Sequence, residues 1–420
     1  MGSTPIAALM VWLIAGAAIV GIVLRPWKVP EAVWASLGAG ATLGFSLISW
    51  PDALAAIRAG TDVYLFLTGM MLLAELARRE GLFAWTAALA TKSAGGSPRR
   101  LFLLIYAVGT VVTVFLSNDA TAVVLTPAVY AATKEAGAPP LPYLFVCAFI
   151  ANAASFVLPI SNPANLVVYG SAMPPLGGWL LQFAPASAAA ILVTYAALRC
   201  TQRARLGPPI AREVAVPALG GGGRVAAAAI AATAVLLSLS SAFGQPLGLP
   251  TFLAGAAAWF AILLLRRSPP WGALRDISWS VLPLVAALFV LVRAIETTGA
   301  FAPLAQQLGA HGAAVSPLRA AAAGSVAAFS ANLINNLPVA LIVAHLLRAA
   351  HASSRIAGAL LIGVDLGPNL SVTGSLATIL WLLALRREGV EVSARRFLWL
   401  GAIVMPLSLA AALGCFLLFA

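Results

Sequence analysis

The tetrapeptide Leu116-Ser117-Asn118-Asp119 interrupts a long apolar run, and Leu333-Ile334-Asn335-Asn336 interrupts a second one 217 residues later. Two other motif pairs repeat in the same order at nearly the same offset: Gly81-Leu82-Phe83 with Gly299-Ala300-Phe301, and Ser97-Pro98-Arg99-Arg100 with Ser316-Pro317-Leu318-Arg319. Three ordered matches at nearly the same offset are rare by chance. They predict a chain built from two homologous halves, each with a polar break inside an apolar segment.

The composition predicts that these segments lie in lipid. Of the 420 residues, 61% are hydrophobic and only 9% are charged, which leaves too little polar surface for a soluble domain. Apolar runs near the ~20 residues that cross the hydrocarbon core recur throughout, from Ile6–Leu24 to Phe397–Phe419. The alternating pattern of a membrane barrel is absent, so helices must satisfy the backbone. The predicted fold class is an all-α polytopic membrane protein.

One polar stretch divides the chain. It contains several arginines and prolines and the flexible run Gly220–Gly223. We therefore predict a first inverted repeat over residues 1–198, a cytoplasmic linker over residues 199–224, and a second inverted repeat over residues 225–420. Five crossings plus one re-entrant hairpin in each half would invert the second half relative to the first. The prediction is about ten transmembrane helices with two opposed hairpins and broken helices.

The distribution of basic residues orients this arrangement. With the linker inside, 20 of the 25 Lys and Arg residues lie in inner loops. The outer side keeps only Arg58, Arg293, Arg319, Arg348 and Arg355. Positive residues collect on the cytoplasmic side of membrane proteins. We therefore predict a multi-pass protein of the cytoplasmic (inner) membrane with both termini outside. The formal charge of +12 is a topology signal, and no nucleic-acid binding is predicted.

Four clusters of Asn, Asp, Ser, Gly and Pro break the apolar segments, at residues 117–121, 159–165, 332–338 and 365–375. Non-helical backbone at membrane depth is tolerated only where protein or a water-filled cavity covers it. Such breaks direct helix N-termini and free carbonyls into a cavity, where they bind small polar solutes. The predicted substrate-binding residues are Ser117, Asn118, Asp119, Ser161, Asn162, Asn165, Asn335, Asn336, Asp365, Thr373, Gly374 and Ser375.

Acidic residues in the breaks are candidates for coupling. An ionised Asp in mid-membrane costs ~2.5–3.5 kcal/mol on insertion scales, so Asp119 and Asp365 are predicted to carry a proton or a cation. A single Ser or Thr in a break is equally compatible with a hydrogen bond between helices. Two other acids are predicted to form helix-end ion pairs, Glu75 with Arg79 and Glu296 with Arg293.

Several classes of site are not predicted. Cys147, Cys200 and Cys415 form no CxxC pair, and His311, His345 and His351 have no carboxylate or Cys at ligand spacing, so we predict neither a metal site nor a cofactor. No GxxxxGK[ST] loop and no clustered catalytic set is present. The chain is therefore predicted to be a secondary transporter and not an enzyme, with energy from an ion gradient or from a partner.

The break motifs resemble those of arsenite efflux permeases in the ion-transporter superfamily. The resemblance rests on residues 115–127, on Asn335-Asn336-Leu337-Pro338 and on residues 365–378, and it extends over nearly the whole chain. It implies export of arsenite and antimonite in exchange for protons. It also implies an elevator-type cycle with a homodimeric scaffold, and it allows for a cytoplasmic arsenite-stimulated ATPase subunit as a partner.

Two alternatives from the same superfamily stay open, a sodium/proton antiporter and a dicarboxylate carrier. Dicarboxylate carriers of this kind have Ser-Asn-Thr at their hairpin tips, whereas this chain has Ser117-Asn118-Asp119, and Asp119 would repel a dianion. Arsenious acid is a neutral triol, and Asn side chains offer it both donors and acceptors. A sodium ion would prefer a cage of carbonyl and carboxylate oxygens. Both sites could be built from these residues.

Overall fold

The computed structural model describes residues 5–266, 271–309 and 316–419. His311 and Arg267, which is one of the 20 bases predicted to lie in inner loops, lie outside the described residues. Across the described ranges the chain forms α-helices with short 3-10 or π-helical turns, and no β-strand occurs there. The predicted all-α fold class is confirmed.

The first half contains ten α-helices. They are α1 (Pro5–Leu24), α2 (Glu31–Gly44), α3 (Trp50–Ala59), α4 (Thr61–Arg79), α5 (Leu82–Ser93), α6 (Pro98–Phe115), α7 (Thr126–Glu135), α8 (Leu141–Ala153), α9 (Pro163–Tyr169) and α10 (Leu176–Gln202). The π-helical turn η2 (Ala120–Leu125) joins α6 to α7, and the 3-10 turns η3 (Pro159–Ser161) and η5 (Arg203–Leu206) precede α9 and follow α10.

The described part of the second half contains the same number of α-helices in the same order. They are α11 (Gly221–Ala242), α12 (Gly248–Arg266), α13 (Trp271–Asp276), α14 (Val281–Thr297), α15 (Ala302–Gly309), α16 (Pro317–Ile334), α17 (Asn336–Ala350), α18 (Ser354–Leu366), α19 (Leu376–Arg387) and α20 (Ala394–Phe419). The 3-10 turns η6 (Gly367–Asn369) and η7 (Val372–Gly374) join α18 to α19.

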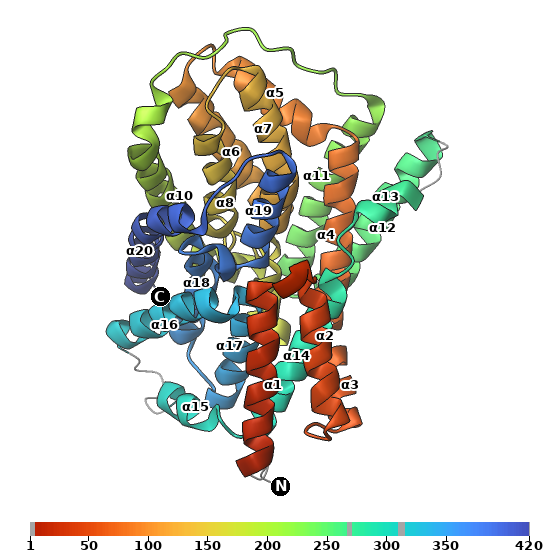
Figure 1. Ribbon diagram of the computed structural model, residues 1–420, viewed down its shortest axis with the longest axis vertical. Helices are drawn as coiled ribbons and strands as arrows, with labels where there is room; N and C mark the ends of the chain where they lie inside the picture. Colours follow the sequence, from red (N-terminus) through yellow and green to blue (C-terminus); the bar gives the residue numbers. More distant parts are fainter. Residues whose placement is uncertain (1–4, 267–270, 310–315, 420) are drawn as a thin grey trace.

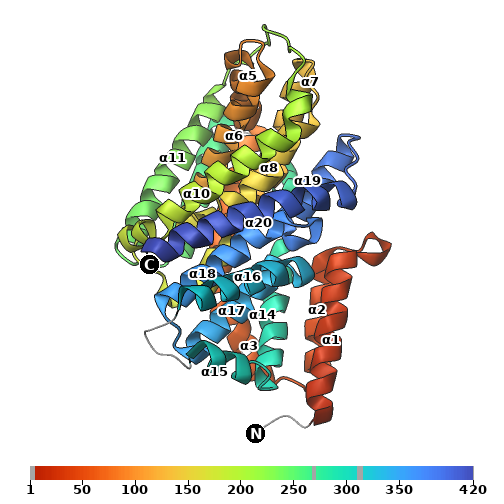
Figure 2. The same ribbon diagram turned by 90° about the vertical axis from the view of Figure 1, so that its left-hand side faces the viewer.

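The packing of the two halves follows a pseudo-two-fold relation. α4 packs on α12 and its counterpart α14 packs on α2, while the corresponding helices α10 and α20 pack on each other. α1 and α11 run in opposite directions along the vertical axis of Figures 1 and 2. At the centre, Asn152 Nδ2 donates to Asn369 Oδ1 at 3.0 Å, and these residues are separated by the repeat offset of 217. The order and direction of the helices agree with inverted repeats.

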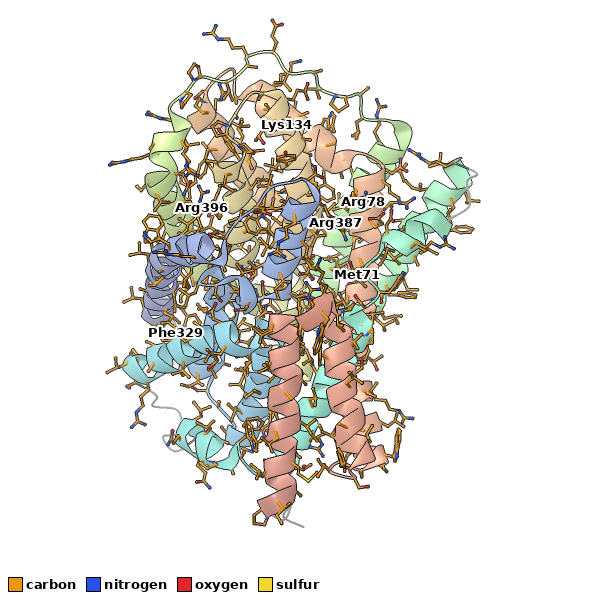
Figure 3. The ribbon with its side chains drawn as sticks, in the orientation of Figure 1. Met71, Arg78, Lys134, Phe329, Arg387 and Arg396 are labelled. Atoms are coloured by element: carbon orange, nitrogen blue, oxygen red, sulfur yellow. The ribbon has the colours of Figure 1, made fainter. Side chains whose placement is uncertain are left out.

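The irregular connection between the halves is shorter than the predicted linker. η5 ends at Leu206 and α11 begins at Gly221, so residues 207–220 form the non-helical stretch. It passes over the upper end of the molecule in Figure 1, at the opposite end from the N-terminus. Figure 3 shows the basic residues Arg78, Lys134, Arg387 and Arg396 in this upper part, above Phe329.

Seven described helical segments are long and apolar enough to cross a membrane. They are α1, α6, α10 with η5, α11, α12, Leu274–Thr297 (which includes α14) and α20. The bent pair α3–α4, with an angle of 46°, makes an eighth. The α8–α9 and α18–α19 segments are too short as single helices because each is broken. The exact count of ten crossings stays a prediction.

The opposed hairpins are visible in the arrangement of α6–α7 and α16–α17. The first lies in the upper part of Figures 1 and 2, and the second lies in the lower part. Each consists of a helix, a break and a returning helix, because Leu116 and Ser117 in the first hairpin and Asn335 in the second depart from α-helix. Their placement agrees with hairpins that enter from opposite sides.

Glycine permits a close helix crossing between α4 and α12. A Cβ at Gly69 would collide with the backbone carbonyl of Thr251, and a Cβ at Gly255 would lie 2.6 Å from Gly69 O. Small residues allow backbones in membranes to approach this closely, since packing and not hydrophobicity drives helix association there.

We expect Gly69→Ala to destabilise the protein by at least ~1–3 kcal/mol, because the methyl group overlaps backbone that cannot turn away. Thermal unfolding of the purified protein in detergent measures the effect. Gly40→Ala is the matched control, since no atom would lie within 4 Å of a Cβ at this position and α2 is exposed there. Equal melting temperatures for the two variants would contradict the prediction.

The predicted sidedness of the linker is tested by cysteine labelling. Gly221 and Gly44 are exposed, and a Cβ at either position would meet no atom within 4 Å. In a chain whose exposed Cys200 is replaced by Ser, Gly221→Cys should react with a membrane-impermeant thiol reagent only after the cells are permeabilised. Gly44→Cys, predicted to lie outside, should react on intact cells. Equal labelling of both positions on intact cells would refute the orientation.

Candidate functional site

The central helices α8 and α18 position the candidate site. Every residue of α8 from Pro142 to Ala153 is buried, and so is every residue of α18 from Ile356 to Leu366. A helix that is apolar on all sides belongs in the interior of a large membrane bundle. Both helices end in polar breaks, over residues 154–162 and 367–375, so their backbone ends are held deep inside the protein.

The tip of the first hairpin is held by its own side chains. Asn118 Oδ1 accepts from the backbone N–H of Asp119 at 2.9 Å, and Ser117 Oγ accepts from that of Ala120 at 3.2 Å. The turn η2 follows, and a hydroxyl pair at 2.8 Å joins Thr121 to Thr113 across the hairpin. Single π-helical turns of this kind are frequent at functional sites.

Asp119 lies at this tip, and its carboxylate has no bonding partner among the described residues. The residue is partly buried, and within the described ranges its side chain forms no hydrogen bond or ion pair. An unpaired carboxylate in a membrane protein is costly. It therefore marks a place where a proton, a cation or a hydrogen-bonding substrate would lower the free energy.

The break between α8 and α9 is tied to the first hairpin. Ser161 Oγ donates to Val114 O at 3.0 Å, and Asn162 caps α9 by accepting from the backbone N–H of Ala164. Asn165 is fully buried and donates to three carbonyls of the break, the shortest at 2.9 Å to Ser155 O. Its Oδ1 has no partner. These predicted residues form one connected polar unit.

Asp365 joins the two halves. Asn162 Nδ2 donates to Asp365 Oδ1 at 2.8 Å, although the residues lie 203 positions apart. Asp365 is fully buried, and its second oxygen, Oδ2, has no hydrogen-bond partner. A buried ionised carboxylate requires several donors, whereas a protonated one needs an acceptor instead. The arrangement favours a carboxyl group that holds a proton or binds a cation.

The second hairpin has a strained tip at Asn335. Its backbone has φ 77° and ψ 153°, a region that residues other than glycine rarely adopt. The side chain caps α17 by accepting from Leu337 N at 3.3 Å, and its amide donates to Thr373 O at 3.4 Å. Asn336, the first residue of α17, is buried. The tip is therefore held against the η7 turn.

The break between α18 and α19 mirrors the first-half break. Thr373 Oγ1 donates to Asn332 O at 3.0 Å, as Ser161 does to Val114. A Cβ at Gly374 would lie 2.8 Å from Asn332 Oδ1, so glycine is required for this approach. Ser375 is buried and caps α19 by accepting from Thr378 N at 3.1 Å.

Three asparagines that were not among the predicted site residues complete the polar core. Asn332 donates to Gly367 O at 2.8 Å and accepts from Ser371, and Asn152 and Asn369 form the central pair. Asn332 and Asn369 lie inside the polar stretches that the sequence shows. Asn152 sits in an apolar run, and only its match to Asn369 at the repeat offset would have revealed it.

The two halves are interlocked at the breaks. The turn η2 of the first hairpin packs against α19 of the second half, and α17 of the second hairpin packs against α9 of the first half. Each hairpin therefore contacts the broken helix of the other repeat. This crosswise packing brings together residues from all four predicted breaks. Within the part of the chain that the structure describes, the side chains of Asp119 and Asn336 form no hydrogen bond.

Charged pairs lie outside the breaks. The predicted pairs of Glu75 with Arg79 at 2.8 Å and Glu296 with Arg293 at 3.0 Å are present. Asp276 joins the first pair, and His345 Nδ1 lies 2.9 Å from Glu296 Oε1. The four break segments contain no Lys, Arg or His. The candidate site is thus rich in amides, hydroxyls and carbonyls, with two carboxyl groups and no cationic side chain.

A family model described as citrate transporter (CitMHS) matches residues 10–365, most of the chain. The chain belongs to this family. It is also 28% identical over 410 residues to an arsenical pump membrane protein of Escherichia coli, with 91% of this chain and 92% of the relative covered. An uncharacterized transporter of Mycobacterium bovis is 26% identical over 405 residues, with 92% of each chain covered.

A solved structure supports the fold. This structure is the YdaH transporter of Alcanivorax borkumensis, which is described as having an unusual topology. It matches with a TM-score of 0.54 at 16% sequence identity, and the match covers 87% of this chain and 86% of the YdaH chain. The resemblance to arsenite efflux permeases and the assignment as a membrane transporter are confirmed. The names of these relatives agree with the predicted transporter.

Proposed function

We propose that this protein exports arsenite, and with it antimonite, across the cytoplasmic membrane in exchange for protons. The proposal is supported by the polar core that the four breaks form, which offers donors and acceptors and no basic side chain. Undissociated arsenious acid carries three hydroxyl groups and no charge, so it needs this kind of surface and no countercharge. The similarity to arsenical pump membrane proteins over 91% of the chain supports the same substrate.

The predicted binding residues enter this proposal in two groups. Ser117, Asn118 and Asp119 lie at one hairpin tip with Ser161, Asn162 and Asn165 behind it. The other tip offers Asn335 and Asn336, backed by Thr373, Gly374 and Ser375. Asp365 bonds to Asn162 and connects the groups. Opposed tips would expose the substrate to each side of the membrane in turn.

Asp119 and Asp365 supply the proposed coupling. Each can hold a proton when the substrate is absent and release it when the site opens to the other side. The carboxylate of Asp119 is unpaired within the described ranges, and Oδ2 of Asp365 lacks a donor. Both observations suit groups whose protonation changes during the cycle, since neither is locked in a saturated hydrogen-bond network.

Citrate is a second candidate substrate, because the family model that matches is described as citrate transporter. The composition of the breaks disfavours it. A polyanion would meet two acidic side chains and no Lys, Arg or His in these segments. Sodium/proton exchange is a further candidate, which the unpartnered oxygens of Asp365, Asn152 and Asn165 favour.

The elevator cycle, the homodimer and the cytoplasmic arsenite-stimulated ATPase subunit belong to the same proposal. In this cycle the hairpins and broken helices move as one body against the remaining helices. The crosswise contacts of α9 with α17 and of η2 with α19 would keep that body together. The proposed dimer would be contradicted if the purified protein had the mass of one chain in detergent and kept full transport activity after reconstitution.

Everted membrane vesicles provide the test of substrate and coupling. Uptake of arsenite, antimonite, sodium and citrate is measured with and without an imposed pH gradient, in vesicles with and without the protein. We expect arsenite and antimonite to accumulate only with the gradient and only when the protein is present. Gradient-dependent movement of citrate or sodium with no arsenite movement would reject the proposed substrate.

A further inference from the structure

A cavity of about 280 Å³ lies apart from the breaks, where the end of α10 and the turn η5 meet the start of α20. Its polar lining comes from Thr201, Gln202, Arg205 and Arg396, and its apolar wall includes Phe145 and Trp399. No acidic residue lines it. The proposed transport of arsenite does not involve this cavity.

The two arginines that line the cavity have no acidic partner. In the described part of the chain neither guanidinium forms an ion pair or hydrogen bond, although the guanidinium of Arg396 lies over the ring of Phe145 at 5.9 Å. Other arginines, such as Arg266 and Arg293, are paired with carboxylates. Two unpaired guanidinium groups at one cavity favour a ligand with a phosphoryl group, which they bind through forked hydrogen bonds.

Gln202 adds a donor that the protein itself does not use. The residue is only 7% exposed, and its amide forms no hydrogen bond within the described residues although it lines the cavity. The amide is therefore accessible from the cavity, where water or a ligand can form its hydrogen bonds. The hydroxyl of Thr201, in contrast, already donates to carbonyls of its own helix.

Exposed side chains beside the cavity are of the kind found at a membrane surface. Trp399 is 62% exposed, and indole rings of this kind collect at the level of lipid headgroups. Beside it α20 exposes Leu398 and, two turns further, Leu407, which offer an apolar path for acyl chains. Figure 3 places Arg396 in the same upper part of the molecule as Lys134 and Arg78. Under the predicted orientation this is the cytoplasmic side, where anionic lipids attract basic residues.

We propose that this cavity binds the phosphate of an anionic membrane phospholipid, with Arg205 and Arg396 on the phosphoryl oxygens and Gln202 as a third donor. The acyl chains lie along α20. Because α10 and α20 pack on each other across the repeat, the lipid would hold together the two halves at this end.

Native mass spectrometry of the full-length protein in detergent tests the proposal. The protein is titrated with phosphatidylglycerol, with phosphatidylcholine of the same acyl chains, and with inorganic phosphate as competitor. We expect phosphatidylglycerol to bind at least tenfold more tightly than phosphatidylcholine, and inorganic phosphate not to displace it at a hundredfold excess. Displacement by phosphate at equal concentration would mean that a free anion is the ligand, and it would overturn the lipid assignment.

The double variant Arg205→Gln with Arg396→Gln should weaken phosphatidylglycerol binding at least tenfold. Its matched control is Arg203→Gln with Arg395→Gln, which removes the same charge from exposed neighbours that do not line the cavity. We expect the control to bind within twofold of the unchanged protein. An equal loss in both would refute a specific cavity site.

Gln202→Leu keeps a side chain of similar size and removes the amide, and it remains informative if the double arginine variant does not fold. It should weaken phosphatidylglycerol binding about threefold or more and leave phosphatidylcholine binding unchanged. Unchanged binding of both lipids would show that the amide does not face the headgroup, and it would overturn the proposed geometry.

Discussion

Asp119→Asn is expected to reduce arsenite extrusion driven by a pH gradient by roughly 10²-fold, comparable to removing a proton-transfer group from a reaction. Asn resembles the protonated acid in shape and in hydrogen bonding, but it cannot release a proton. The empty carrier should then reorient at any pH. Arsenite binding and downhill arsenite exchange should persist, because the amide still donates and accepts.

The same measurements on Asp365→Asn decide which carboxyl group couples the proton. Asn at position 365 can still accept from Asn162 Nδ2 through its Oδ1 atom, so the bond between the halves should survive. Proton-driven flux and arsenite binding are measured for each variant. Loss of flux with retained binding identifies the coupling residue, and loss of both identifies a substrate ligand. If Asp119→Asn kept the proton-driven flux of the unchanged protein, the proposed role of Asp119 in coupling would be rejected.

Asp276→Asn is the matched control for both variants. Its carboxylate pairs with Arg78 and Arg79 outside the breaks, and its side chain is 51% exposed. An ion pair with this exposure contributes little to stability, ~0–1 kcal/mol. Proton-driven arsenite flux in this variant should match that of the unchanged protein. A loss as large as that of Asp119→Asn would indicate that any change of charge disturbs the carrier.

Substitutions of Asn335 should separate backbone strain from side-chain function at the second hairpin tip. Glycine adopts φ 77° and ψ 153° without the steric cost of about 1–3 kcal/mol that other residues meet there. We expect Asn335→Gly to raise the melting temperature and Asn335→Ala to lower it, since alanine keeps the strain and loses the cap on α17. Both variants should lose most arsenite binding, because the amide is absent.

The corresponding residue of the first hairpin provides the control. Asn118 does not have a positive φ, so Asn118→Gly relieves no strain and should lower the melting temperature by loosening the tip. Thermal unfolding and arsenite binding are measured on the same preparations. Equal thermal shifts for Asn118→Gly and Asn335→Gly would contradict a strained second tip. Retained binding in both Asn335 variants would remove this residue from the proposed substrate site.

The sequence by itself determined the class of the protein, its division into halves and the positions of the four breaks. These features depend on local composition and on spacing along the chain. Lipid requires long apolar helices, and a helix broken by Asn, Gly and Pro in such a setting needs a protected polar environment. The offset of 217 between Asn118 and Asn335 relates two halves without any knowledge of contacts.

Only the tertiary structure decided which of these polar groups meet. The bond from Asn162 to Asp365 and the central pair of Asn152 with Asn369 join residues more than 200 positions apart. The strain at Asn335 is a backbone conformation that asparagine tolerates but does not dictate. The cavity that Arg205 and Arg396 line lies where the turn η5, which follows α10, meets the start of α20. Crossing positions depend on the packing of whole helices, and a pattern along one helix cannot specify them.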